Sequence, residues 1–168
     1  MTAAKRILVT GGGGFLGKAI VKLLVARGDR VRSFSRSSYP ALEEMGVEQV
    51  QGDLADADEV AAACKGVEAV YHVAAKAGIW GPREAFYRAN VTGTQNVIAA
   101  CRRHGIERLV YTSSPSVVFD SGDMEGADES APYPARFHAP YPETKATAEQ
   151  MVIAASREGL PAVCLRPH

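Results

Sequence analysis

Short apolar runs alternate along the chain with longer stretches in which apolar residues recur every three or four positions. A short apolar run between turn residues is typical of a buried strand, and the longer recurrence is typical of a helix with one buried face. The strands predicted in this way are Arg6–Thr10, Asp29–Ser35, Val47–Gln51, Glu68–Val73, Arg108–Ser113 and a sixth that begins at Pro161–Arg166. The helices predicted between them are Phe15–Arg27, Asp56–Cys64, Glu84–His104 and Pro142–Glu158.

This alternation of strands and helices favours a parallel sheet with helices on both faces. Because crossovers between parallel strands are right-handed, we expect a doubly wound α/β sheet, the Rossmann fold. The 168 residues suit a single domain, so residues 1–168 are predicted to form one unit. The sixth strand runs into Arg166-Pro167-His168, where its carboxyl end should border a ligand crevice. We therefore expect the chain to be a fragment of a longer protein.

One long irregular stretch, residues 120–140, lies between the fifth strand and the last helix. It contains Pro132, Pro134 and Pro140 among acidic and small residues. Loops of this length in compact domains are commonly functional or mobile. Because the stretch follows the end of a strand, we predict a lid that faces the substrate.

Composition argues against several classes of partner. Lys and Arg together number 19, as do Asp and Glu, so no bulk charge favours nucleic acid or an anionic membrane. No apolar run approaches the roughly 20 residues that span a bilayer, and the first strand begins too early for a signal peptide. Cys64, Cys101 and Cys164 have no metal-binding spacing and are expected to be buried thiols. We expect a cytoplasmic protein without a metal site.

A glycine-rich segment, residues 10–17, follows the first strand and opens the first helix. Gly12, Gly14 and Gly17 fit the spacing G-x-G-x-x-G, and Gly11 with the last two fits T-G-x-x-G-x-x-G. Without side chains, the backbone N–H groups and the helix N-terminus can approach a pyrophosphate. A turn that needs glycine only for strand–helix packing is the alternative. The context favours a dinucleotide site.

The end of the second strand is where a Rossmann domain contacts the adenosine ribose. A carboxylate is usual there for NAD(H), but this chain has Ser35 and Arg36. The planar guanidinium of Arg36 suits a 2′-phosphate, so NADP(H) is favoured over NAD(H). A solvated arginine is the competing interpretation. Asp53, at the end of the third strand, is a candidate to accept from the adenine amino group or is a surface turn residue.

Three polar residues in the second half of the chain form a candidate reaction centre. Tyr141 and Lys145 are four residues apart in a predicted helix and therefore share one face. An ammonium beside the phenol favours the phenolate and makes proton exchange with a carbonyl oxygen feasible. Ser114, at the tip of the fifth strand, would hydrogen-bond the same oxygen. His72, in an apolar strand, is expected to be a structural histidine.

Seven motifs in this order resemble the extended short-chain dehydrogenase/reductase family. They are T-G-x-x-G-F-L-G, Gly52-Asp53-Leu54, His72-Val73-Ala74-Ala75, Asn90-Val91-Thr92-Gly93-Thr94, Tyr111-Thr112-Ser113-Ser114, Tyr141-x-x-x-Lys145 and Leu165-Arg166-Pro167. The resemblance implies that Ser114, Tyr141 and Lys145 are catalytic and that Lys145 also holds the nicotinamide ribose. It further implies cofactor contacts from the glycine segment and later motifs, at Gly11, Gly14, Phe15, Leu16, Gly17, Asp53, Leu54, Ala74, Ala75, Lys76 and Asn90.

Other segments are similar to the 3β-hydroxysteroid dehydrogenase-like branch of that family. Residues 36–40, 75–81 and 114–117 are most similar to bacterial reductases of 2-alkyl-3-oxoalkanoates. Phe119 and Asp120 stand where sugar-nucleotide epimerases usually have Tyr-Gly. The resemblance implies a homodimer formed through the two long helices, and a C-terminal substrate domain that this sequence lacks.

The sequence therefore predicts an NADP(H)-dependent reductase of a ketone on a hydrophobic substrate, a β-keto acid or a steroid-like compound. Two other functions stay open. One is a sugar-nucleotide-type epimerase or dehydratase with a tightly bound cofactor, and the other is a nucleotide-binding module without catalysis.

Overall fold

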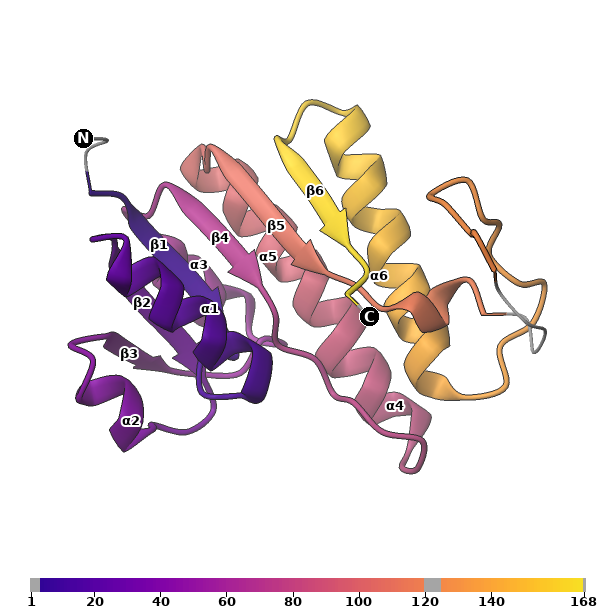
Figure 1. Ribbon diagram of the computed structural model, residues 1–168, viewed down its shortest axis with the longest axis horizontal. Helices are drawn as coiled ribbons and strands as arrows, with labels where there is room; N and C mark the ends of the chain where they lie inside the picture. The colour runs from indigo at the N-terminus through magenta and orange to yellow at the C-terminus, as the bar shows by residue number, and fades with distance from the viewer. Residues whose placement is uncertain (1–3, 120–124, 168) are drawn as a thin grey trace.

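The computed structural model describes residues 4–119 and 125–167 and contains one parallel sheet in that part of the chain (Figure 1). Its order is β3-β2-β1-β4-β5-β6, which is the doubly wound arrangement expected. All strands point their carboxyl ends to one edge, and the order reverses between β1 and β4. The strands are β1 (Arg6–Thr10), β2 (Arg30–Ser35), β3 (Glu48–Gln51), β4 (Ala69–His72), β5 (Arg108–Thr112) and β6 (Ala162–Leu165).

Helices cover both faces of the sheet, as predicted. One face carries α1 (Phe15–Ala26), and the other carries α3 (Ala57–Cys64), α5 (Gly93–His104) and α6 (Pro140–Arg157) (Figure 1). The remaining helical segments are short: α2 (Pro40–Glu43), α4 (Arg83–Phe86), a π-helical turn (Tyr87–Thr92) and a 3₁₀ turn (Pro115–Val117).

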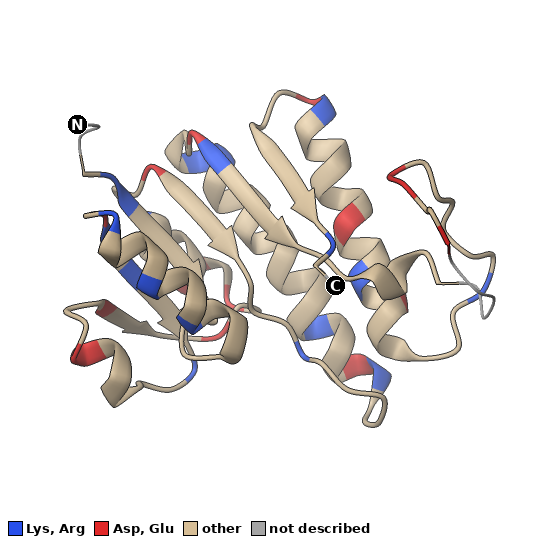
Figure 2. Ribbon diagram, in the orientation of Figure 1, with Lys and Arg blue, Asp and Glu red and all other residues tan. Residues whose placement is uncertain are grey.

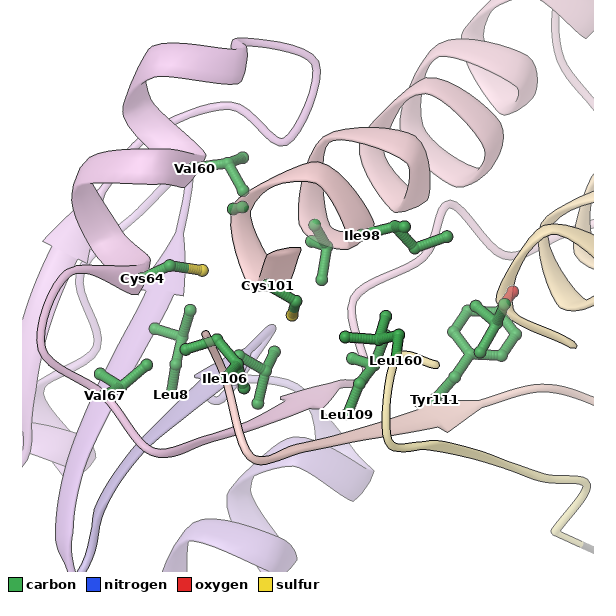
Figure 3. Packing of buried hydrophobic residues seen from close by; sticks show 14 of the residues in the cluster. Leu8, Val60, Cys64, Val67, Ile98, Cys101, Ile106, Leu109, Tyr111 and Leu160 are labelled. Atoms are coloured by element: carbon green, nitrogen blue, oxygen red, sulfur yellow. The ribbon is translucent and has the colours of Figure 1, made fainter. Parts of the chain in front are cut away.

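Side-chain alternation along β1 divides the core into two layers. Leu8 packs toward the face covered by α3 and α5, whereas Ile7 and Val9 pack toward α1. Figure 3 shows the first layer, in which Leu8 and Leu109 of the sheet point toward side chains of α3 and α5. Strands buried on both sides must be apolar at successive positions, which explains the continuous apolar run at the start of the chain.

The long helix predicted for residues 84–104 differs from the structure in its interior. The helical run begins at Arg83 and includes the π-helical turn, in which the N–H of Gly93 bonds the carbonyl of Arg88, five residues earlier. A hydrophobic pattern does not distinguish a widened turn from an α-helical one, so the π-helical turn could not be predicted from it. The short helix α2 was also not predicted. Helix α6 begins at Pro140 rather than Pro142, after the N-cap Ala139, and both prolines lie in the first turn, which tolerates them.

The segment predicted to be a lid is described from residue 125 onward; residues 120–124 lie outside the described part. The described portion contains no helix or strand before α6. Its side chains Tyr133 and Phe137 pack against Val117, Val118 and Ala146. This segment is therefore anchored on the start of α6.

Acidic and basic side chains are interspersed over the elements, and β4 to β6 are largely free of both (Figure 2). Within the described residues, no helix has the length and apolar character needed to cross a membrane. Cys64 and Cys101 are buried as expected, but Cys164 on the edge strand β6 is only partly buried. The prediction of three buried thiols is therefore correct for two.

Leu109 in β5 provides a test of the core, because its side chain is fully buried. We expect Leu109→Ala to lower the free energy of unfolding by about 2–5 kcal/mol, since it removes buried methyl groups and leaves a cavity. Leu23→Ala is the matched control, because Leu23 on α1 is 73% exposed. Urea denaturation of both variants checks this; equal losses would contradict the assignment of Leu109 to the core.

Candidate active site

A large cleft opens at the carboxyl edge of the sheet, with a volume of about 690 Å³. Every strand contributes to its wall through the residues that follow it. The lining comprises Gly11, Gly14–Gly17, Phe34–Ser37, Tyr39, Gly52–Leu54, Val73–Ala77, Ala85, Arg88, Ala89, Thr112–Ser114, Tyr141 and Pro167. In an open α/β sheet this edge is where ligands bind, at the point where strand order reverses.

The glycine segment forms the wall of the cleft beside β1. Gly11 has a φ of +70°, which favours glycine, and a Cβ on Gly17 would lie 2.1 Å from the carbonyl oxygen of Gly11. Gly11 therefore requires glycine for its backbone conformation, and Gly17 requires it for the close approach of the two backbone segments. Gly14 differs, because a Cβ there would meet only the Gly11 oxygen at 3.4 Å. It is also the N-cap of α1 and offers no side-chain cap, so the first-turn N–H groups are free of a capping side chain.

The β2 and β3 ends form the next part of the cleft. Ser35 and Arg36 line it, and the Arg36 side chain is exposed without an ion pair to any described residue. Asp53 also lines the cleft, but its carboxylate is already engaged. One oxygen accepts from Arg88 at 2.8 Å and the other accepts from the backbone N–H of Ala55 at 2.9 Å.

The reaction end of the cleft contains Ser114 and Tyr141, which both line it. Ser114 caps the 3₁₀ turn, and its hydroxyl lies 2.8 Å from that of Ser116. Lys145 lies one helical turn after Tyr141 and is buried behind the lining. Its ammonium donates to the carbonyl of Thr112 at 2.6 Å and lies 4.2 Å from the centre of the Tyr111 ring. Burial lowers the pKa of Lys145 to about 7.

A directed chain of hydrogen bonds runs beneath the cleft. The Thr94 hydroxyl donates to the carbonyl of Asn90 at 2.6 Å, so its oxygen accepts from His72 Nε2 at 3.0 Å. His72 Nδ1 then accepts from the Thr10 hydroxyl at 2.7 Å, and that oxygen accepts the N–H of Val73. Burial and, as a smaller contribution, the Lys145 charge together lower the pKa of His72 to about 3. The imidazole is neutral and structural, as expected.

The Asn90 side chain joins this chain of bonds to α6. Its oxygen accepts the N–H of Lys76 at 2.7 Å, and its amide donates to the carbonyl of Lys76 and to the hydroxyl of Thr144, each at 3.0 Å. The Thr144 hydroxyl donates to the Pro140 carbonyl at 2.7 Å. Asn90 thus fixes the loop after β4 against the first turn of α6.

The structure gathers most of the predicted site residues in one place. The following line the cleft: Gly11, Gly14, Phe15, Leu16, Gly17, Ser35, Arg36, Asp53, Leu54, Ala74, Ala75, Lys76, Ser114 and Tyr141. Asn90 and Lys145 lie behind this lining and act on it through hydrogen bonds.

Sequence reasoning missed Arg88 and Tyr39, which also line the cleft. Arg88 stands in the helix beside Asn90, but only the three-dimensional structure pairs it with Asp53. Tyr39 is held by Gln49, whose side chain bonds both its N–H and its carbonyl. Among the described residues, no cluster of three or more His, Cys, Asp or Glu side chains is suited to a metal ion.

The doubly wound sheet, the glycine segment and the Ser114–Tyr141–Lys145 arrangement together define a short-chain dehydrogenase/reductase-type Rossmann domain. A sequence model of the 3-beta hydroxysteroid dehydrogenase/isomerase family matches residues 8–168, and the chain belongs to that family.

Relatives with assigned activities agree with this assignment. The chain is 56% identical to a 2-alkyl-3-oxoalkanoate reductase of Stenotrophomonas maltophilia, over 97% of this chain and 50% of that protein. It is 40% identical to a 3 beta-hydroxysteroid dehydrogenase/Delta 5-->4-isomerase of Mycobacterium tuberculosis, over 99% of this chain and 47% of that protein. The chain therefore spans about half the length of these relatives.

Solved structures share the fold. A Thermus thermophilus UDP-glucose 4-epimerase in complex with NAD superposes with a TM-score of 0.85 at 32% identity, over 96% of this chain and 54% of that one. A short-chain dehydrogenase/reductase superfamily protein of Agrobacterium tumefaciens with bound NAD has a TM-score of 0.84 at 33% identity, over 96% of this chain and 48% of that one.

The role of Asn90 leads to a stability prediction. We expect Asn90→Ala to lower the free energy of unfolding by about 2 kcal/mol or more, because it leaves both backbone groups of Lys76 without their partner. Asn96→Ala is the matched control on α5, where the side chain donates a single bond to Leu54, and should cost about 1 kcal/mol. Chemical denaturation measures both; an Asn90 variant no less stable than the control would contradict this role.

Proposed function

We propose that this chain is the cofactor-binding and catalytic half of an NADPH-dependent reductase, which converts a ketone on a hydrophobic substrate to a secondary alcohol. The observation that carries the proposal is the convergence at one cleft of an uncapped glycine loop with Ser114 and Tyr141, backed by Lys145. Fold alone would not suggest a chemistry, and these side chains are what supports the proposed one.

The cleft fits a dinucleotide by the chemistry of its donors. The first-turn N–H groups of α1 would bind the pyrophosphate, for which the bare backbone at Gly14 leaves room. The free guanidinium of Arg36, at the end of β2, supports preference for a 2′-phosphate. Asp53 and Leu54 would flank the adenine. The bound cofactor supplies the hydride.

The residues of this chain would supply the proton and the polarisation. The Ser114 hydroxyl would donate a hydrogen bond to the ketone oxygen and stabilise the charge that develops there. Tyr141 would transfer its phenolic proton to that oxygen as the carbonyl carbon receives hydride, giving the alcohol. The buried cation of Lys145 would stabilise the resulting phenolate and hold the nicotinamide ribose.

The substrate class rests on the names of the relatives and on the surface beside the cleft. Both relatives quoted above are named for hydrophobic oxo or hydroxy compounds. Ile79 and Trp80 are exposed by 69% and 88% and come two and three residues after Ala77 of the cleft wall. A β-keto acid with an alkyl chain suits such a surface better than a sugar nucleotide does.

A homodimer is part of the proposal. The outer faces of α5 and α6 form a shallow groove that includes Ile98, Met151 and Ala154. Two long helices that present such side chains side by side are suited to pack against the same pair in a second copy.

Replacing Tyr141 tests the mechanism. We expect Tyr141→Phe to lower the rate of NADPH-dependent ketone reduction by about 10²–10⁴-fold, because it removes only the transferable proton. The dissociation constant for NADPH should stay within a few-fold. Both are measured on the protein expressed from its complete reading frame. A turnover rate like that of the wild type would refute the role of Tyr141.

The same assay separates the two enzyme classes. A reductase releases one oxidised cofactor for each ketone consumed, whereas an epimerase retains its cofactor across turnovers. Binding of NADPH without any turnover would instead favour a non-catalytic module.

Replacing Arg36 tests the choice of cofactor. We expect Arg36→Gln to weaken NADPH binding about tenfold or more, since a charge-assisted hydrogen bond is worth about 1.5–3 kcal/mol, and to leave NADH binding nearly unchanged. Arg30→Gln removes the same charge at the opposite end of β2 and serves as control. Equal weakening of both cofactors by the Arg36 substitution would be inconsistent with a 2′-phosphate contact.

A further inference from the structure

A buried carboxylate lies in α6 outside the cleft and has no part in the mechanism above. The Glu149 side chain is only 1% exposed. The Arg166 guanidinium donates to both carboxylate oxygens of Glu149. Its Nε lies 3.2 Å from Oε1 and 3.1 Å from Oε2, and its Nη2 lies 2.6 Å from Oε1. The hydroxyl of Tyr133 donates to the same carboxylate at 2.6 Å. The guanidinium carbon also lies 5.8 Å from the centre of the Tyr133 ring.

These three residues come from three different parts of the chain. Glu149 is in α6, Arg166 follows β6, and Tyr133 belongs to the segment before α6. Glu149 also stands four residues after Lys145, which places the two side chains on the same face of the helix, one turn apart. The carboxylate is therefore held in place from two sides next to the lysine of the reaction centre.

Several titratable groups surround Lys145. From the sheet these are His72 of β4, Tyr111 of β5 and Cys164 of β6. From α6 they are Tyr141 and Glu149. His72 is neutral, and burial raises the pKa of Cys164 to about 12, so the thiol is neutral as well. Glu149 is thus the anion among these groups at neutral pH, and its charge acts on Lys145 without a direct ion pair.

We propose that Glu149 is a positioning residue of the reaction centre, which, held by Arg166 and Tyr133, keeps the buried Lys145 side chain in its ammonium form. This inference rests on the proposed function. A buried ion pair by itself contributes little net stability, so stabilising the fold does not account for the Glu149–Arg166 pair. An action of the Glu149 charge on the buried ammonium of Lys145, one helical turn away, does account for the Glu149–Arg166 pair.

The electrostatics agree in sign with this role. Burial alone would raise the pKa of Glu149, but its hydrogen bonds from Arg166 and Tyr133 help to bring that pKa below its usual value. The carboxylate is therefore ionised at neutral pH. Burial lowers the pKa of Lys145, and the Glu149 charge opposes that effect. Loss of the carboxylate should lower the pKa of Lys145 further and reduce the fraction of ammonium near pH 7.

The test is Glu149→Gln in the protein expressed from its complete reading frame. The ¹³C shift of the Lys145 side chain is followed by NMR against pH, together with the pH profile of ketone reduction. We expect the midpoint of the lysine titration and the alkaline limb of kcat to move to lower pH by about one unit. At pH values below both midpoints, the lysine is cationic in both proteins and the rates should converge.

Controls separate charge from folding. Glu107→Gln removes a glutamate from an exposed ion pair with Lys5 and should leave both profiles unchanged. If Glu149→Gln does not fold because Arg166 is left unpaired, the double variant Glu149→Gln/Arg166→Met removes the pair together and should show the same shift.

A lysine midpoint at the wild-type pH, with a rate lowered equally at all pH values, would overturn the proposal and leave Glu149 a structural residue only. The NMR titration needs no substrate. Absence of ketone reduction by the wild-type protein would therefore defeat the proposed function while the titration still decides the role of Glu149.

Discussion

The hydrogen-bond chain from Thr10 to Thr144 is the constraint on which the site depends. It joins the end of β1, the end of β4, the π-helical turn and the start of α6 through buried side chains. Every side chain in it has a hydrogen-bond partner, and the order of donors and acceptors fixes the tautomer of His72. Such a fully satisfied network permits one arrangement only, since any shift would leave buried polar groups unpaired. The end of β1, where the glycine segment begins, and the start of α6 are thereby held in fixed relation.

The π-helical turn serves the same constraint. Its widened turn aims the Asn90 side chain at the loop after β4, while the carbonyl of Asn90 is satisfied by the Thr94 hydroxyl. At its end, Gly93 lies so close to Leu54 that a Cβ would approach the Leu54 side chain to 2.9 Å. The turn therefore brings the wall of the cleft at β3 into contact with the helix. Interrupted helices of this kind often occur at functional sites.

The fold and most of the cleft could be predicted from the sequence because both depend on local patterns. Apolar runs and glycine spacing mark strand ends, and parallel strands bring their ends to one edge. The partners within the site could not be predicted, because they join residues far apart in the chain. Asp53 pairs with Arg88, and Asn90 bonds Lys76, contacts that no periodicity encodes. The burial of Lys145 behind the cleft likewise follows only from packing.

The position of Lys145 shows why residues outside a cleft can govern its chemistry. An ammonium taken out of water loses its hydration, and here the compensation is one backbone carbonyl, the face of an aromatic ring and a nearby carboxylate. The carbonyl and the ring belong to β5 and are fixed with the sheet. The carboxylate is different, because the strand exit at Arg166 and the segment that carries Tyr133 determine its place. The surroundings of the Lys145 side chain thus depend on the packing of that segment as well as on the residues that line the cleft.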